Sequence, residues 1–425
     1  MAGSRLRLPL ALVATVVAAG AATLILRPRD GLIDPAAVDV TAYFRPAQLE
    51  RATDFRDLQR VIGIGQLVLS GMVLGVLALR PPGRFRAVLS RLERRPLRGG
   101  AVAGAVISLV LTVTGLPLAW WAHERAVDYG LSTQSLGPWL GDVAKSGAIG
   151  LFFAAVGGLL AVGLTSRFPR RWWIPGGGVV VGLAVLSIYL SPVLIDPLFN
   201  KFEPLPRGPL RGEVLRLADR AGVDVGQVYR VDASRRTTAI NAYVIGLGHT
   251  KRVVIYDNLI DDFPPDQVRS VVAHELGHVH DSDLSRGLTW VLIVAFPGAW
   301  LVQLVTERIT RARGVPAALP ALALALGLVS FGLMSGSNAL SRPVEAHADA
   351  FALRLTDDPK AFIALERSLA VRNLGDPDPP AAFQLLFGTH PTTKQRIGFG
   401  EAWKKGDGRA DALSGRSRRP ARGGS

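Results

Sequence analysis

Long apolar runs, separated by short segments rich in arginine, set the pattern of this 425-residue chain. A helical run of about 20 residues, at about 1.5 Å per residue, covers the hydrocarbon layer of a bilayer. Seven runs reach or approach this length: Leu8–Leu26, Val61–Leu79, Ala101–Trp121, Gly147–Leu164, Val179–Leu194, Leu288–Val305 and Ala317–Ala339. A single run of this kind is also typical of a buried core helix, but the whole set predicts seven membrane-spanning helices.

The first run also has features of a signal peptide, because Arg5 and Arg7 precede it. Against that alternative, Arg27-Pro28-Arg29 at its end lacks the small residues of a cleavage site. We therefore interpret it as a spanning helix. The segment from Arg27 to Arg60 mixes arginines with acids and predicts a loop with a short surface helix.

The polar segment between the fifth and sixth runs has a different period. Apolar residues at helical spacing predict one helix over Pro209–Ala221 and another after Pro264 and Pro265. Three short stretches are β-prone, and we expect the last two to form a hairpin: Val228–Val231, Ala239–Ile245 and Arg252–Tyr256. The chain is therefore predicted to be a mainly α membrane protein that carries a small α+β module.

These patterns divide the chain into five parts. They are spans one to five with their loops (1–194), the α+β module (195–287), spans six and seven (288–340), a C-terminal helical region (341–403) and a basic tail (404–425). The tail is rich in Gly, Arg and Ser, a composition that predicts disorder.

Charge and cysteine content narrow the function classes. The formal net charge is +15, but most basic residues lie in short loops between the spans and in the tail, where they act first as topology signals. We therefore expect a lipid bilayer around the protein and no nucleic-acid partner. The chain has no cysteine, so a metal site would have to use histidine and carboxylate ligands.

The stretch Val272–Asp281 carries the clearest chemistry. His274 and His278 are four residues apart on a predicted helix, so both imidazoles lie on one face and can reach one tetrahedral cation. Glu275 lies beside them and can act on a metal-bound water. This pattern is typical of a zinc peptidase; the alternative is an ordinary amphipathic helix with two surface histidines.

A catalytic zinc site needs a third protein ligand and an open position. After the last span, Glu345 and Asp349 lie four residues apart on another predicted helix. Glu345 is the candidate third ligand, and Asp349 is a candidate acceptor that orients a ligating imidazole. His347 points elsewhere on the helix and is the weaker ligand candidate.

Two further groups are candidates for contact with substrate. His390 could donate to the oxyanion of a tetrahedral intermediate, and Arg396 could brace that site or bind substrate, although a capping histidine and a solvated arginine are the ordinary alternatives. Asn241-Ala242-Tyr243 could form an edge strand that binds an extended peptide through main-chain hydrogen bonds, or it could be an internal strand of the small sheet.

Together these residues resemble the type I CAAX prenyl endopeptidases over about residues 60 to 400. The matching motifs are His274-Glu275-Leu276-Gly277-His278, Glu345-x-x-x-Asp349, His390-Pro391, Arg396-Ile397, Pro197–Phe202 and Asn241-Ala242-Tyr243. The resemblance implies that the spanning helices enclose a large intramembrane chamber. It also implies that His274, His278 and Glu345 bind one Zn²⁺ per chain, that Glu275 is the general base, and that His390 stabilises the oxyanion. Where eukaryotic members have a longer stretch ending in a further histidine, this chain reads Val279-His280-Asp281-Ser282-Asp283.

We therefore expect a multi-pass cell-membrane zinc metalloendopeptidase. The Arg-rich, Lys-poor composition is typical of a high-GC bacterium, and most bacteria do not prenylate proteins, so we expect non-prenylated membrane or membrane-adjacent peptides as substrates. One alternative is a signalling receptor that uses a peptidase-like domain as a sensor. Another is a transporter, but the spans contain almost no ionisable residues of the kind that line an ion path.

Two arguments about membrane orientation disagree. The resemblance places the catalytic module on the cytosolic side. The arginine clusters after the second, fourth and sixth runs favour cytoplasmic loops there, which would place the module on the other side.

Overall fold

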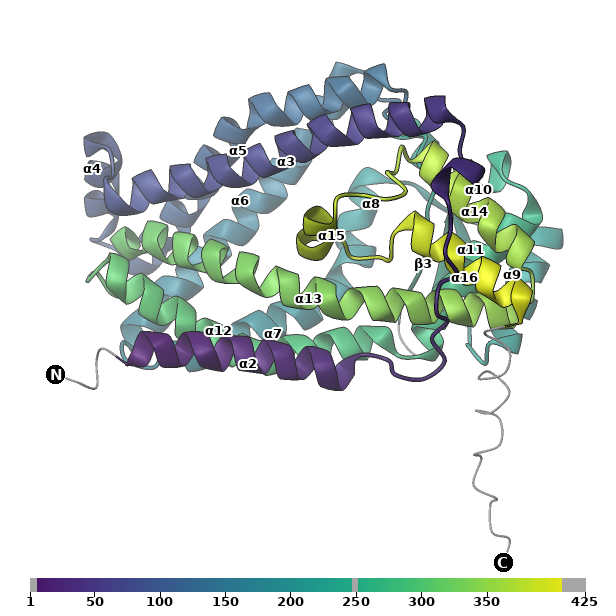
Figure 1. Ribbon diagram of the computed structural model, residues 1–425. Coiled ribbons are helices and arrows are strands. Elements are labelled where there is room, and N and C mark those ends of the chain that lie inside the picture. The colour runs from purple at the N-terminus through teal and green to yellow at the C-terminus, as the bar shows by residue number, and fades with distance from the viewer. Residues whose placement is uncertain (1–5, 247–250, 407–425) are drawn as a thin grey trace, which may run out of the picture.

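The computed structural model describes residues 6–246 and 251–406, and seven of its helices are long and apolar enough to cross a membrane (Figure 1). They contain the seven predicted runs: α2 (Arg7–Leu26), α3 (Pro46–Leu79), α5 (Pro96–Asp128), α6 (Leu136–Arg167), α7 (Trp173–Leu190), α12 (Asp283–Ile309) and α13 (Leu319–Thr356). Helix α7 continues through a π-helical turn (Ser191–Ile195) into the short α8 (Asp196–Phe199). The mainly α membrane fold is confirmed.

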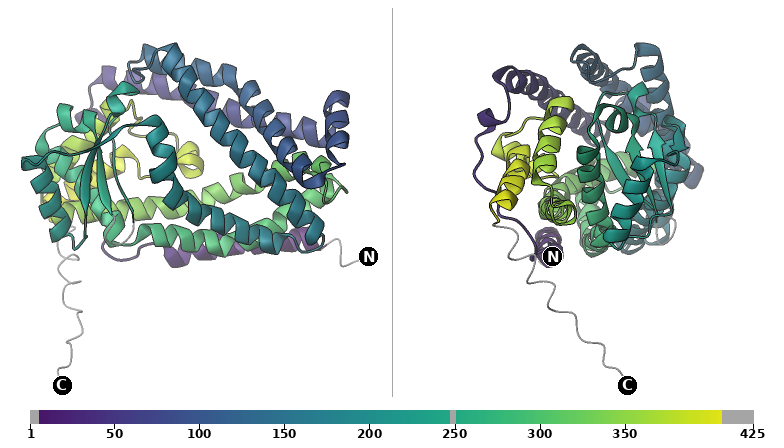
Figure 2. Two further views of the ribbon diagram at one scale, coloured as in Figure 1. Left: turned by 180° about the vertical axis from the view of Figure 1, so that it is seen from behind. Right: turned by 90° about the vertical axis from the view of Figure 1, so that its right-hand side faces the viewer.

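The spanning helices form two groups that diverge toward the polar module. Helices α3, α5 and α6 lie on one side and α2, α12 and α13 on the other, while the short α4 (Gly83–Leu92) caps the end remote from the module (Figures 1 and 2). Between α6, α7, α12 and α13 lies an apolar cavity of about 510 Å³. Residues Met334 and Ser337 of α13 line it, the latter about two helical turns before Glu345.

The polar module contains a four-stranded mixed sheet. Its strands are β1 (Phe202–Pro204), β2 (Gln227–Val231), β3 (Ala242–Ile245) and β4 (Arg252–Tyr256), in the order β1-β2-β4-β3. Strands β3 and β4 pair antiparallel, which confirms the predicted hairpin, whereas β2 pairs parallel with β4. Strand β3 therefore lies at the edge of the sheet.

Helices from the whole C-terminal half surround the sheet (Figure 2). They are α9 (Pro209–Arg220), α10 (Asp257–Asp262), α11 (Pro265–His280), α14 (Pro359–Arg372) and α16 (Thr393–Lys405), whereas α15 (Ala381–Phe387) lies against α13 between the spanning helices. The inner face of α11 is fully buried at Val272, Ala273 and Leu276, in a core shared with β4 and the end of α13. This packing fixes the helix that carries His274 and His278.

The segment between the first two spans differs from its prediction. Helix α3 begins at Pro46, so the expected loop with a short surface helix is wrong beyond that residue. Before it, the chain crosses α16 as an extended strap, with Ile33 and Phe44 buried and the Ala36 amide donating to the Gly398 carbonyl at 3.0 Å. Tertiary contacts with α16 therefore order a stretch whose charge pattern had indicated a surface loop.

At the C-terminus, α16 continues through Lys405, two residues into the segment expected to be disordered. The rest of that basic tail, residues 407–425, lies outside the described residues.

Candidate metal centre

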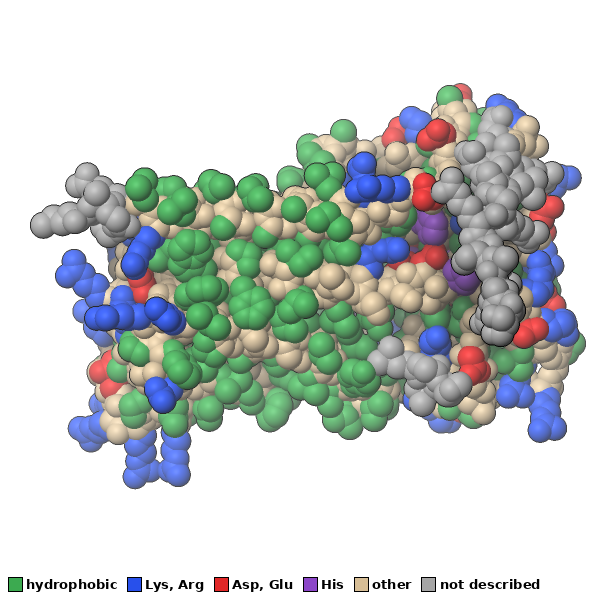
Figure 3. Space-filling view, turned by 90° about the horizontal axis from the view of Figure 1, so that it is seen from below, with side chains coloured by type: hydrophobic (Ala, Val, Ile, Leu, Met, Phe, Trp, Pro, Cys, Tyr) green, Lys and Arg blue, Asp and Glu red, His purple; other side chains and the backbone are tan. Residues whose placement is uncertain are grey.

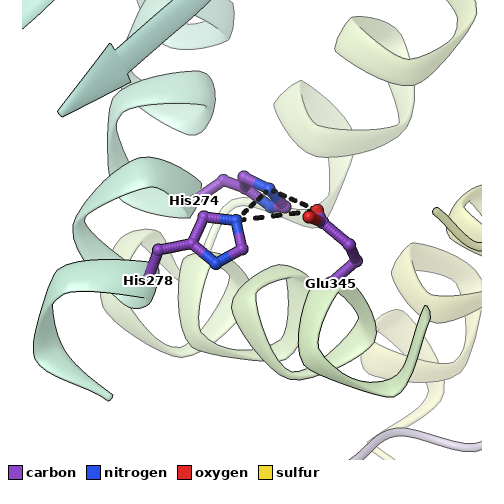
Figure 4. Close-up of side chains that lie close together, drawn as sticks. All are labelled: His274, His278 and Glu345. Carbon is purple, nitrogen blue, oxygen red and sulfur yellow. Dashed lines mark hydrogen bonds and ion pairs between the residues drawn. The ribbon is translucent and has the colours of Figure 1, made fainter. Parts of the chain in front are cut away.

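Three ligand atoms converge between α11 and α13 (Figure 4). The Nε2 atoms of His274 and His278 are 3.2 Å apart, and Glu345 Oε2 lies 3.2 Å from the first and 3.6 Å from the second. A tetrahedral ion with bonds of about 2.0–2.1 Å sets its ligand atoms about 3.3 Å apart, so the three atoms fit one zinc-sized cation. Glu345 Oε2 is also buried without a hydrogen-bond donor, as expected of an atom that serves a cation.

Close packing of the two helices brings the ligands together. Gly277 of α11 faces α13, and a Cβ at that position would lie 3.2 Å from Phe351 Cβ and 3.3 Å from the Ala348 Cα. The glycine between the two histidines therefore allows α11 to approach α13 closely enough for Glu345 to reach the imidazoles. The contact at Gly277 therefore joins residues more than 60 positions apart in the sequence into one site.

Each imidazole is oriented by a carboxylate at its other nitrogen. His274 Nδ1 lies 2.8 Å from Asp349 Oδ1, and His278 Nδ1 lies 2.9 Å from Asp283 Oδ2. With Nδ1–H donating to the carboxylate, each Nε2 keeps its lone pair for a cation. The structure thus places Asp349 beside His274, as expected from the sequence, and adds Asp283 as the partner of His278.

Behind Asp349 lies a largely buried charge network. Arg396 donates to both Asp349 oxygens, from Nε at 2.8 Å and from Nη2 at 2.5 Å, and its Nη1 lies 3.0 Å from Glu366 Oε2. Asp349 is 0% exposed and Glu366 2% exposed. The opposing carboxylates raise the pKa of the guanidinium above its ordinary value even though burial alone would lower it. Arg396 therefore braces the site rather than facing solvent.

Glu275 and His390 reach the neighbourhood of the centre from different elements, α11 and the loop after α15. Glu275 follows His274 on α11, and burial raises the pKa of its carboxyl, which favours proton uptake. His390 lies on the loop after α15, with Nε2 3.2 Å from Glu345 Oε2 and its side chain 54% exposed. Partial desolvation beside the centre lowers the pKa of His390 from its ordinary value, so its neutral form, which can donate one hydrogen bond, is favoured.

The other sequence candidates lie further out. Asn241 precedes the edge strand β3, which packs beside α11, and Ala242 and Tyr243 belong to that strand. The Asn241 carbonyl accepts from the Tyr256 amide at 3.1 Å, on the side of the strand that faces β4. His347 turns away from the ligands and pairs with Asp281 at 2.7 Å, in agreement with its ranking as the weaker ligand candidate.

Two supporting residues were missed in the sequence. Asp283 is five positions after His278, which is no helical spacing, but Ser282 adopts a left-handed conformation (φ 57°) and turns the chain back at the start of α12. The only sequence feature that pointed to Asp283 was its place in the acidic stretch after the motif that contains His274 and His278. Glu366 lies on α14, and a single acid between apolar residues of a predicted helix gave no sign of a buried pair with Arg396.

Comparison with known proteins agrees with this geometry. Residues 204–404 match the model of peptidase family M48, and residues 67–201 match that of the CAAX prenyl protease N-terminal region with five membrane helices. The uncharacterized metalloprotease YhfN of Bacillus subtilis is 30% identical over 375 residues, which cover 85% of this chain and 88% of the relative. CAAX prenyl protease 1 of Saccharomyces cerevisiae is 34% identical over 179 residues, 41% of this chain and 39% of the relative.

A solved structure shows the same fold. The crystal structure of S. mikatae Ste24p superposes with a TM-score of 0.75 at 18% identity, over 94% of this chain and 99% of that one. The predicted resemblance is confirmed.

Proposed function

Since the chain belongs to peptidase family M48 and is a multi-pass membrane metalloprotease, we propose that it is a zinc-dependent endopeptidase of the cell membrane. His274, His278 and Glu345 would hold one Zn²⁺ per chain, and Glu275 would be the general base. The observation that carries this proposal is the convergence of three ligand atoms within 4.8 Å of one another. Two nitrogens and one carboxylate oxygen, with a fourth position left for water, are the donor set of a catalytic zinc site.

When bound, zinc supplies Lewis acidity, which acidifies water and polarises a carbonyl. In the proposed mechanism Glu275 accepts the proton of the attacking water and later delivers it to the leaving amine. His390 donates from Nε2 toward the developing oxyanion. Asp349 and Asp283 hold the two ligand rings in one orientation throughout.

The surroundings of the centre favour an extended, partly apolar peptide as substrate. Strand β3 lies at the edge of the sheet, where an extended peptide could add as a further strand, with Asn241, Ala242 and Tyr243 as the proposed contact residues. The Ala242 amide, which donates to Asn241 Oδ1 at 2.9 Å, would exchange that partner for the peptide. The apolar cavity between the spanning helices ends about two turns of α13 before Glu345. Although some relatives are named for prenylated CAAX substrates, nothing in this arrangement requires a prenyl group. We propose non-prenylated membrane or membrane-adjacent peptides as substrates.

The test separates metal binding from chemistry. Glu275→Gln should keep its zinc, because Glu275 is not a ligand, but should cleave a peptide about 10²- to 10⁴-fold more slowly because its proton transfer is lost. Zinc is measured by mass spectrometry of the purified protein, and cleavage by the release of labelled peptides from casein. Glu213→Gln removes a carboxylate from the surface of α9, where it pairs with Arg216, and serves as the matched control.

Three outcomes would contradict parts of this proposal. Cleavage by Glu275→Gln at the wild-type rate would contradict the assigned base. Wild-type protein that binds zinc but cleaves no peptide would favour the sensor alternative. Protein purified with a different metal, active only with that metal, would overturn zinc and leave the ligand set in place.

A further inference from the structure

Four arginines surround one cavity at the end of the molecule remote from the metal centre. The cavity holds about 290 Å³, lies at the bend between α4 and α5, and is lined by Arg91, Arg94, Arg95 and Arg98 together with Leu92, Gly99 and Val102. The α4 end is at the left of Figure 1, and Lys and Arg side chains gather at the same end in Figure 3. No acid is among the lining residues.

The bend is part of the packed core. Leu89 of α4 is 5% exposed, and Phe85 and Leu92 pack against the same buried cluster. A Cβ at Gly99 would lie 2.3 Å from the Leu92 carbonyl oxygen and 2.9 Å from Pro316 Cγ, so only glycine lets α4 end against the first turn of α5. The backbone of the bend is therefore held in place, and the four exposed arginine side chains extend from this fixed frame.

The positive charges of the four arginines have no acidic partner among the residues that line this cavity. In residues 6–246 and 251–406, the side chains of Arg91, Arg94, Arg95 and Arg98 make no hydrogen bond or ion pair, and Glu93 between them pairs with none of them. Four guanidinium groups around one small volume repel one another unless an anion lies between them. The N-terminus of α5, a helix of 33 residues that begins at Pro96, adds the positive end of its dipole.

The apolar neighbours indicate which kind of anion fits. Leu97 and Val102 of α5 are 50% and 47% exposed directly beside the arginines, on a helix that spans the membrane. In a bilayer, arginines beside the end of such an apolar helix are expected at the level where headgroups meet the hydrocarbon layer. We propose that this cavity binds the headgroup phosphate of an anionic glycerophospholipid, with the acyl chains lying along Leu97 and Val102. Guanidinium groups bind phosphate oxygens in pairs of parallel hydrogen bonds, which suits this ligand.

The experiment compares two variants of the full-length protein that lose equal charge at the same end. One is Arg91→Gln/Arg94→Gln/Arg95→Gln/Arg98→Gln. The control is Arg84→Gln/Arg86→Gln/Arg308→Gln/Arg311→Gln, four exposed arginines that do not line the cavity. Binding of dioleoylphosphatidylglycerol, dioleoylphosphatidylcholine and inorganic phosphate is titrated in detergent and followed by native mass spectrometry.

Wild type and control should bind phosphatidylglycerol at least about tenfold more tightly than phosphatidylcholine, and the cavity variant should lose at least about tenfold in affinity. An equal loss in the control would show that total charge matters and the cavity does not. Displacement of the lipid by inorganic phosphate would make the cavity a site for soluble anions, and either result would overturn the proposal. If the cavity variant does not purify as a folded protein, Arg95→Gln/Arg98→Gln is compared with Arg84→Gln/Arg86→Gln. The proposal does not rest on peptidase activity.

Discussion

The two histidines of the metal centre are supported in opposite ways. His274 is held by Asp349, Arg396 and Glu366, which come from three different helices and are almost entirely buried. His278 is held by Asp283, which follows it by five positions and also pairs with Arg286 close to the surface. Both carboxylates perform the same task on the imidazole, but one depends on the whole fold and the other on a single turn.

The difference teaches where stability and metal binding are coupled. Around His274, two carboxylates share one guanidinium, so the removal of any member leaves a buried charge without its partner. Around His278, water can replace a lost partner more readily, because that side chain is 23% exposed whereas the His274 side chain is 10% exposed. We therefore expect folding to fail first on the His274 side and metal affinity alone to change on the His278 side.

The largest effect is expected for Asp349→Ala. It leaves Arg396 with Glu366 alone and His274 without its acceptor, which should destabilise the protein by about 3–5 kcal/mol. The apparent melting temperature of the metal-free protein in detergent measures this loss. Asp378→Ala removes an acid that is 53% exposed and pairs with Lys394, so it should cost at most about 1 kcal/mol and serves as the control. Equal melting temperatures of Asp349→Ala and Asp378→Ala would contradict the expected coupling between folding and the His274 side of the centre.

Asp283→Ala should have a smaller and different effect. The His278 ring loses its orienting partner, so zinc affinity should fall about 10- to 100-fold while the melting temperature of the metal-free protein changes little. Competition with a coloured chelator measures the affinity, and Asp378→Ala again provides the reference. A loss of folding as large as that of Asp349→Ala would show that the His278 side is not local after all.

The pH dependence of stability should sharpen the contrast further. Burial raises the pKa of Glu366 to about 7, although Arg396 from α16 and His274 from α11 oppose the shift, while Asp349 and Glu345 from α13 add to it. The folded protein therefore binds this proton more tightly than the unfolded chain does. The stabilising contribution is complete below the ordinary pKa of glutamate and is lost as the pH rises through about 7.

Glu366→Gln should abolish that dependence. The wild type should lose melting temperature between pH 5 and pH 8 relative to the variant, measured in detergent without metal. A difference between the two proteins that stays constant with pH would mean that Glu366 is ionised throughout.

The smallest effect is expected for Ser282→Gly. Ser282 has a φ of 57°, which costs a side-chain-bearing residue more than glycine, so the variant should be more stable by up to about 1 kcal/mol with unchanged zinc affinity. Ser282→Val should be destabilised, because a β-branched residue resists this conformation. A fall in zinc affinity in the glycine variant would show that the serine side chain, and not the backbone turn, positions Asp283.

Local patterns in the sequence predicted much of this molecule. The seven spans, the helix that carries His274 and His278, and the pairing of β3 with β4 all follow from short-range periodicity. Glu345 was found because the site needed a third ligand, and four-residue spacing then brought in Asp349. Both lie on one helix, so their relation was readable without a fold.

What escaped prediction depends on distant contacts. Glu366 meets Arg396 only because α14 and α16 pack together, and the strap around Ile33 is ordered by α16, more than 350 residues later. The parallel pairing of β2 with β4 likewise has no local signature. Such features can be predicted only when the tertiary structure is known, because the adjacent sequence does not distinguish a buried acid from a solvated one.

Helix α13 runs from Leu319 to Thr356 with Pro343 inside it, so one helix carries both an apolar run long enough to cross a membrane and the ligand Glu345. About 39 Å of helix separates Leu319 from Glu345. Close to Glu345 the helix packs tightly against α11 at Gly277, which keeps the carboxylate 3.2 Å from His274 Nε2. His274 sits on α11, which is anchored in the polar module. The membrane-crossing part of the chain and the polar module therefore meet at the metal centre, and each contributes ligands to it.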